Sequence, residues 1–93
     1  MNSRNPLRDK LKALFSKHMK ETRDNVGDSQ EAMAAKLDIS ARSYFDLDKG
    51  KSLCSTFVLV RYLVLLYKAG KVLPFLQSLS EVVDEVDRSN SSN

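Results

Sequence analysis

The side chains best able to contact another molecule are concentrated in one short stretch, residues 40–51. Arg42 carries a guanidinium, whose forked N–H groups match the two acceptors on a guanine edge. Asp46, four residues later, can accept from the amino group of cytosine, and Phe45 can contact the methyl group of thymine. The same spacing allows Arg42 and Asp46 to form an ion pair on one face of a helix. The stretch therefore predicts either a reader of base edges or an ion-paired helix surface.

The chain carries no comparable set of residues for catalysis or metal binding. It has one histidine, His18, and one cysteine, Cys54, which lie far apart in the sequence. Neither is accompanied by a base, an orienting acid, a metal-ligand cluster or a Gly-rich phosphate loop. His18 beside an apolar helical stripe is typical of a partly buried or surface side chain, and Cys54 near a helix start is typical of packing. We therefore predict no enzyme activity, no catalytic residues, no metal site and no cofactor.

The composition predicts one cytoplasmic domain. Ninety-three residues with 42% hydrophobic content can form one modest core and leave no room for a second. A single cysteine excludes an intramolecular disulfide, which fits a reducing compartment. We find no secretory signal. The most apolar run, residues 57–67, is interrupted by Arg61 and is too short to span a bilayer, so we expect no membrane contact.

Positive charge is concentrated at the N-terminal end of the chain. Residues 1–23 hold seven basic side chains against two acidic ones, whereas residues 24–51 hold four against six. Residues 52–93 have four of each sign, so the net charge of +3 is due to the first segment. A basic segment of this kind suits contact with a polyanion, and it is equally compatible with a solvated helix face.

Apolar residues recur at helical spacing along the chain, which predicts an all-α fold, a compact five-helix bundle. Turn residues separate the segments, with Gly50 and Gly70 following the third and fourth. The predicted helices are residues 6–23, 30–37 and 41–48, a fourth from a Ser52 or Ser55 cap to Gly70, and a fifth that begins near Pro74. The predicted units are a main domain over residues 6–70, a C-terminal helix over 71–88, and flexible ends at 1–5 and 89–93.

The second and third predicted helices are joined by a short turn, which is the arrangement of a helix-turn-helix. Such a unit needs a small residue where the helices cross and an apolar residue in the turn, and Ala34 and Ile39 supply them. Tyr44 and Leu47 lie three residues apart and would hold the angle of the third helix from its inner face. The residues at the start of that helix, where base edges of DNA come within reach, are Ser40, Arg42 and Ser43.

Over residues 29–51 the chain resembles the lambda-repressor-like, or Xre/Cro-type, helix-turn-helix regulators. In that family the unit opens with Ser or Thr and Gln-Glu, has a Val/Ile-Ser turn, and closes with Glu, a basic residue, Gly and Lys. The resemblance extends more loosely over residues 7–70. Asp28 departs from the pattern, because an apolar residue is common there, and Asp48 takes the place of the closing glutamate. The matching residues are Ser29, Gln30, Glu31, Ala34, Leu37, Ile39, Ser40, Leu47, Asp48, Lys49, Gly50 and Lys51.

The resemblance implies a sequence-specific DNA-binding transcriptional regulator, with repression as the default, that inserts helix 40–48 in the major groove of an operator. Its partner would be double-stranded DNA, in the cytoplasm and at the nucleoid when bound. Gln30 would both touch a phosphate and brace the recognition helix. Base contacts are expected at Ala41, Arg42, Asp46 and Phe45. Contacts with the DNA backbone are expected at Gln30, Ser40, Ser43, Lys49 and Lys51.

The fifth predicted helix carries an apolar seam of two heptads. We predict that this seam joins two copies as a homodimer, because one small domain buries too little DNA surface for tight specific binding. The alternative is that the seam packs on the core of its own domain and leaves a monomer. The seam residues are Val72, Leu76, Leu79, Val83 and Val86.

A protein-interaction module of the same fold is the second candidate function. In that case Phe45 or the 72–86 seam would hold a protein partner, such as a toxin or a larger regulator. The net negative charge of residues 24–51 is its main support. A DNA-binding measurement at graded salt separates the two candidates, because phosphate contacts make affinity salt-dependent.

Overall fold

Side-chain caps define where the first four helices begin. In the computed structural model, which describes residues 5–91, Asn5 Oδ1 accepts from two backbone N–H groups at the start of the first helix. Ser29, Ser40 and Ser55 cap the next three helices, each accepting from the N–H three residues on. The helices are α1 (Pro6–Val26), α2 (Gln30–Leu37), α3 (Ala41–Asp48), α4 (Thr56–Lys68) and α5 (Val72–Ser91). The predicted all-α, five-helix fold is confirmed for residues 5–91, which contain no strand.

Two helices are longer than predicted. α1 continues to Val26, because the first residue that terminates it is Gly27, which adopts a left-handed conformation (φ 72°) and donates to the carbonyls of Arg23 and Asp24. α5 begins at Val72, because proline is tolerated in the first turn of a helix and Pro74 therefore does not mark its start.

The C-terminal end of α5 also differs from the sequence prediction. The helix continues to Ser91, through polar residues that we expected to belong to a flexible end. Residues 88–91 contain neither glycine nor proline, so nothing in their backbone chemistry stops a helix that is already formed. Of the ends predicted to be flexible, residues 1–4 and 92–93 lie outside the described residues, and Asn5 is the cap of α1.

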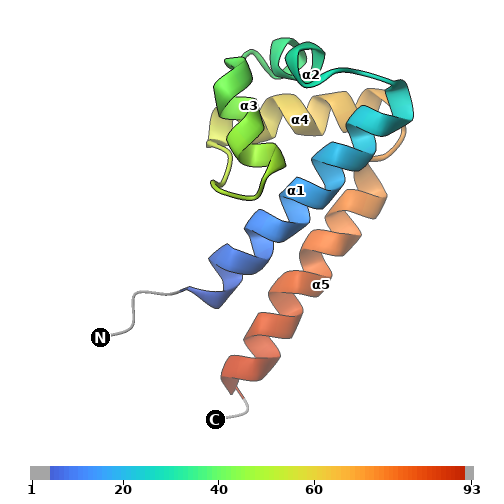
Figure 1. Ribbon diagram of the computed structural model, residues 1–93. Coiled ribbons are helices and arrows are strands. Elements are labelled where there is room, and N and C mark those ends of the chain that lie inside the picture. The colour runs from blue at the N-terminus through green and yellow to red at the C-terminus, as the bar shows by residue number, and fades with distance from the viewer. Residues whose placement is uncertain (1–4, 92–93) are drawn as a thin grey trace.

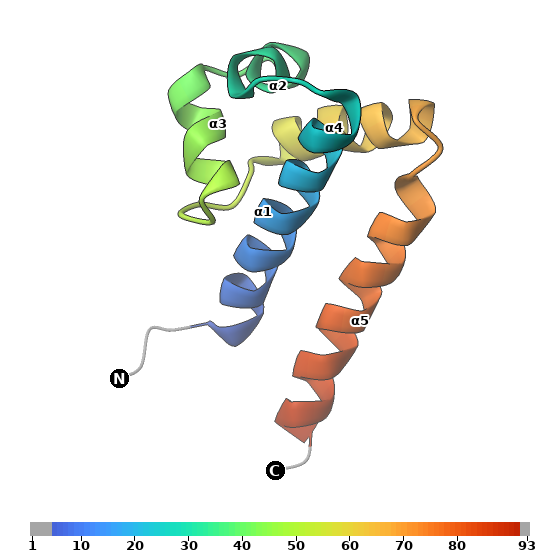
Figure 2. The same ribbon diagram turned by 45° about the vertical axis from the view of Figure 1, so that its right-hand side comes forward.

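The two long helices, α1 and α5, lie side by side and run in opposite directions (Figure 1). An ion pair between Lys10 Nζ and Glu85 Oε1 (3.5 Å) joins the start of α1 to the later part of α5. α4 crosses them near their other ends, and α2 and α3 pack over α4 and α1, respectively (Figure 2). This arrangement leaves α3 at the edge of the fold, on the side away from α5. No helix in the described part of the chain has both the length and the apolarity that a membrane crossing requires.

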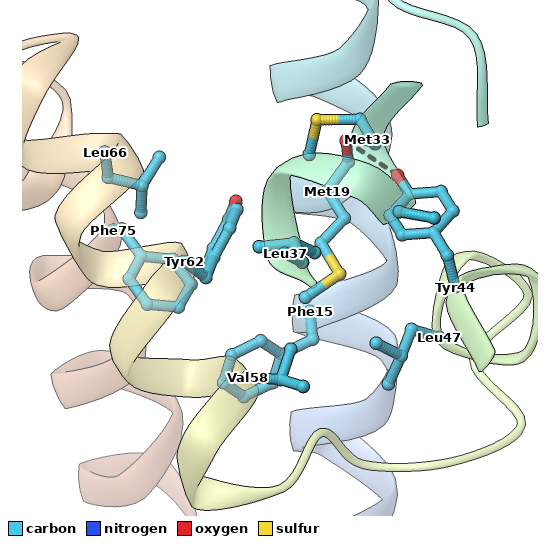
Figure 3. Packing of buried hydrophobic residues seen from close by; sticks show 11 residues of the cluster. Phe15, Met19, Met33, Leu37, Tyr44, Leu47, Val58, Tyr62, Leu66 and Phe75 are labelled. Atoms are coloured by element: carbon cyan, nitrogen blue, oxygen red, sulfur yellow. Dashed lines mark hydrogen bonds between the residues drawn. The ribbon is translucent and has the colours of Figure 1, made fainter. Parts of the chain in front are cut away.

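The core lies where α1, α2, α3 and α4 converge (Figure 3). Ala34 is buried where α2 meets its neighbours, and Ile39 in the α2–α3 turn packs against the same cluster, as predicted. The side chains of the core that are fully buried, with no exposed surface, are Met19, Met33, Leu37, Tyr44 and Tyr62. Because Tyr44 and Leu47 are both buried, α3 is held from its inner face and its opposite face is turned to solvent.

Phe75 fastens α5 to the core. Its ring meets those of Phe15, His18 and Tyr62 edge to face, with centroids 5.2 to 5.4 Å apart, a favourable geometry for aromatic pairs. The seam predicted from the heptad spacing of α5 did not include Phe75, because this residue lies between two seam positions, one residue before Leu76. Its burial shows that the apolar face of α5 is centred on the domain's own aromatic cluster.

The seam residues of α5 are used within the chain to different extents. Val72 and Leu79 pack against the core cluster, and Val86 is buried further along the helix. Val83 is half-buried, whereas Leu76 keeps 42% of its surface exposed. Most of the seam therefore packs against α1 and the core of its own domain, as the alternative to a dimer interface predicted. Among the seam residues, Leu76 has the largest exposed fraction and is the most accessible to another molecule.

The stability of this aromatic cluster should depend on pH through His18. Burial lowers the pKa of His18 below its ordinary value of 6.5, an effect that Glu21 opposes and Lys17 reinforces. The folded state therefore favours the neutral ring, so stability is fully present above pH 6.5 and is lost as the pH falls below it. We expect the urea-unfolding free energy to fall in that range, and to fall less in His18→Gln. An identical pH dependence in the variant would contradict this assignment.

Candidate nucleic-acid interface

The turn before α3 sets the direction of that helix. Asp38 takes a left-handed conformation (φ 60°), and the N–H of Ile39 donates to the carbonyl of Ala34, which closes the end of α2. The Ser40 hydroxyl then accepts from the backbone N–H of Ser43 and donates to the Ser43 hydroxyl, both at 3.0 Å. The two serines predicted to contact the DNA backbone are thus exposed, and they are hydrogen-bonded to each other where Ser40 caps α3.

Asp48 locks the other end of α3. Its side chain is buried, with 2% of the residue exposed, and it is held from three helices. Oδ2 accepts from Gln30 Nε2 of α2 (3.1 Å) and lies 3.5 Å from Arg23 Nη2 of α1, while Oδ1 accepts from the Tyr44 hydroxyl at 3.3 Å. The Asp48 carbonyl also accepts from the Ser16 hydroxyl at 2.6 Å. A buried charge with this many partners fixes where α3 lies relative to α1 and α2.

The network around Asp48 contains two residues whose structural roles were predicted from the sequence. Asp48 has the scaffold role that its position in the motif implied, and Gln30 has its bracing role, since it reaches Asp48 at the end of α3. The contacts of Arg23 and Ser16 with Asp48 were not predicted, because Asp48 lies more than twenty residues away from both in the chain. Burial, followed by the charge of Asp48, raises the pKa of Tyr44 to about 12, so its hydroxyl remains a donor at neutral pH.

The outer face of α3 begins with exposed side chains. Ala41, Arg42 and Ser43 are all exposed, and the Arg42 side chain is 83% accessible. Arg42 Nε lies 3.7 Å from Asp46 Oδ1, so the ion pair that the sequence allowed is formed in the free protein. An exposed pair of this kind contributes little to stability, and its guanidinium can exchange the carboxylate for another acceptor at small cost. Asp46 therefore neutralises and orients Arg42 without burying it.

Phe45 lies beside two cations. Its ring is half-buried, with Lys49 Nζ 5.3 Å and Lys51 Nζ 5.8 Å from the ring centroid, within the range of cation–π attraction. Both lysines are exposed, and Gly50 between them adopts a left-handed conformation (φ 74°) that turns the chain away from α3. The end of α3 thus presents an aromatic ring flanked by positive charge.

A groove between α1 and this corner extends the basic surface. Its walls come from the middle of α1 and from the residues that follow α3, and it encloses about 630 Å³. Lys12, Ser16 and Lys20 share one face of α1, because they are spaced four residues apart. That spacing was readable in the sequence, but only the packing of α1 on α3 shows which of the basic residues reach the corner. The residues that line the groove are Asp9, Lys12, Ala13, Ser16, Lys17, Lys20, Lys49 and Gly50.

The described residues contain no group of three or more histidine, cysteine, aspartate or glutamate side chains placed to hold a metal ion. Cys54 is half-buried, and burial raises the pKa of its thiol, which disfavours the reactive thiolate. Of the residues expected to contact DNA, all but Gln30 lie on α3 or directly beside its ends, whereas the Gln30 amide is bonded to Asp48. Comparisons with families of known proteins, with curated proteins and with solved structures find no match for this chain.

Proposed function

We propose that the protein is a sequence-specific DNA-binding transcriptional regulator of the helix-turn-helix type, with α3 as its recognition helix. The observation that carries the proposal is the contrast between the two faces of α3. The inner face is bonded to α1 and α2 through Asp48 and Tyr44. The outer face exposes Arg42 to solvent beside small polar residues. A rigid helix with an exposed guanidinium near its N-terminal end, held only by a surface ion pair, suits the reading of guanine edges in a major groove.

The lysines around the end of α3 support the same proposal. Lys49 and Lys51 flank Phe45, and the groove beside them adds Lys12, Lys17 and Lys20 from α1. This cluster compensates for the net negative charge of residues 24–51, because α1 brings cations from a different part of the sequence. Such a surface would contact phosphates, position the helix on the duplex and make the affinity salt-dependent.

The structure gives less support to a protein partner held by Phe45 or by the seam. An aromatic ring flanked by two ammonium groups suits a polyanion better than an apolar surface. Most of the seam covers α1 within the same chain. Our proposal includes a homodimer on a pseudo-palindromic operator, acting in the cytoplasm by repression.

Selection of bound sequences from a random pool of double-stranded DNA tests the proposal. We expect one recovered motif, and a palindromic motif would indicate that two copies bind with their recognition helices one turn of DNA apart. Recovery of no motif, with equal binding to all sequences, would argue against a sequence-specific regulator.

Arg42→Ala should weaken binding to the selected site. Loss of a bidentate contact with guanine costs about 1–3 kcal/mol, which corresponds to roughly 5- to 150-fold in affinity, and it relaxes the preference at one base pair. Titration of the selected and a scrambled duplex measures both effects. Arg88→Ala is the matched control, because it removes the same residue type from an exposed position near the end of α5, where no contact with DNA is assigned. Equal affinity of Arg42→Ala and the unmodified protein for the selected duplex would contradict the assigned role.

A further inference from the structure

The outer face of α4 carries an apolar stripe that no other element in the described part of the chain covers. Phe57, Val60, Val64 and Tyr67 follow one another at intervals of three, four and three residues, which places them on one side of the helix. Each is between 47% and 73% exposed. Large apolar side chains that line up in this way on a solvent-exposed helix mark an interaction surface more often than singly scattered ones do.

Part of this stripe lines an open groove of about 480 Å³. We call its aliphatic lining, which comes from α4, the floor, and its basic lining, Lys36 from the end of α2 with Arg61 and Lys68 from α4, the rim. The residues that line it, all within the described part of the chain, are Lys36, Val60, Arg61, Val64, Leu65 and Lys68.

All three charged side chains of the rim are positive. α4 contains no aspartate or glutamate. Lys36 already forms an ion pair with Asp28, whereas neither Arg61 nor Lys68 has an ion pair within residues 5–91. Arg61 is held in place, since Nη2 donates to the Lys36 carbonyl (3.2 Å) and the guanidinium lies 6.0 Å from the Phe57 ring. The groove therefore offers two cations beside an apolar floor.

We propose that this groove binds an acidic amphipathic helix of a partner protein. The apolar side of such a helix would cover Val60 and Val64, and its carboxylates would pair with Arg61 and Lys68. A second copy of this chain is a poorer occupant, because two α4 helices packed face to face would bring cations together with no acid between them. DNA is also a poorer occupant, because phosphates gain nothing from an aliphatic floor.

The proposal is independent of the proposed DNA-binding function. The lining residues come from α2 and α4 alone, so a helix bound in the groove would not cover the outer face of α3. One surface would then read an operator while the other holds a partner. Peptide binding and DNA binding are measured separately, so the failure of one proposal is distinguishable from the failure of the other.

The test uses the full chain and two synthetic peptides of about 20 residues, long enough to form a helix. Both carry leucines at intervals of three and four; one has glutamates and the other lysines at the flanking positions. We expect the glutamate peptide to bind at least roughly tenfold more tightly in an anisotropy titration. The double variant Arg61→Glu/Lys68→Glu should reverse that preference. Equal binding of the two peptides by the unmodified protein would overturn the proposal.

Val64→Glu should weaken binding of the glutamate peptide by at least roughly tenfold, because it places a carboxylate on the apolar floor. Val26→Glu is the matched control, since Val26 is also an exposed valine (55% against 47% for Val64) and lies at the end of α1, outside the groove. Circular dichroism checks that each variant is folded. Sedimentation that shows a dimer disrupted by Val64→Glu would overturn the proposal in favour of a second copy. Binding to anionic vesicles without binding to the peptide would overturn it in favour of a membrane surface.

Discussion

Asp48→Ala should lower the free energy of unfolding by about 3 kcal/mol. The substitution removes the acceptor of the Gln30 amide and the Tyr44 hydroxyl, and it leaves Arg23 as a partly buried cation without its carboxylate. Breaking a buried ion pair from one side costs several kcal/mol, because the remaining groups have lost water without keeping a partner. Urea unfolding followed by circular dichroism measures the change.

Asp46→Ala is the matched control for this prediction. It removes the same residue type from the same helix, two positions away, but its carboxylate is partly exposed and, within residues 5–91, pairs with the exposed Arg42 alone. A surface pair of this kind contributes between 0 and about 1 kcal/mol, so the control should remain close to the unmodified protein. Asp48→Ala should also weaken DNA binding more than Asp46→Ala does, since α3 is no longer fixed against α1 and α2. Equal stability of the two variants would show that the Asp48 network does not hold α3.

Reversing both charges at the end of α3 should have the largest effect on DNA binding. In Lys49→Glu/Lys51→Glu we expect affinity for any duplex to fall by about 100-fold or more at roughly 0.1 M salt, because two phosphate contacts are replaced by repulsion. The slope of log affinity against log salt should become shallower by about two, which is roughly one per lost phosphate contact. Titrations at several salt concentrations give both quantities.

Lys68→Glu/Lys71→Glu supplies the control, because both double variants change the net charge by the same amount. Lys68 and Lys71 lie at the end of α4 and in the residues that follow it, away from α3. If the overall field of the protein caused the binding, the two double variants would lose affinity equally. We expect the control to lose only a small part of the affinity and to keep its salt slope, because no phosphate contact is assigned to it.

The local features of the fold were readable in the sequence because their causes are local. Ser29 and Ser40 cap helices through N–H groups three residues away, and Gly50 ends a helix through its own backbone freedom. These interactions depend on neighbours in the chain, so the bounds of α2 and α3 were predicted correctly. The burial of Tyr44 and Leu47 followed from helical spacing in the same way.

The sequence did not show what the apolar side of an amphipathic helix packs against. The same pattern of apolar residues fits both the core of the same domain and another molecule. α5 packs on α1 through Phe75, which lies beside the seam, and Val86 of the seam is buried, whereas from the heptad spacing we predicted that the seam joins two copies. For α4, the sequence showed an apolar run interrupted by Arg61, without showing which of its sides is covered. Only the packing reveals that Phe57, Val60, Val64 and Tyr67 remain exposed, because α2 and α5 pack against other sides of α4 and Thr22 of α1 contacts Tyr62 of α4.

The sequence by itself determined that five helices form, where α2 and α3 begin and end, and which residues of α3 lie on its inner and outer faces. The tertiary structure alone decided that Arg23 and Ser16 hold Asp48, that lysines of α1 reach the corner beside Lys49, and that α5 covers its own domain. The physical reason is the range of the interactions. Caps and helical periodicity act within a few residues, whereas ion pairs, grooves and covered faces are set by contacts between segments that the chain brings together only when it folds.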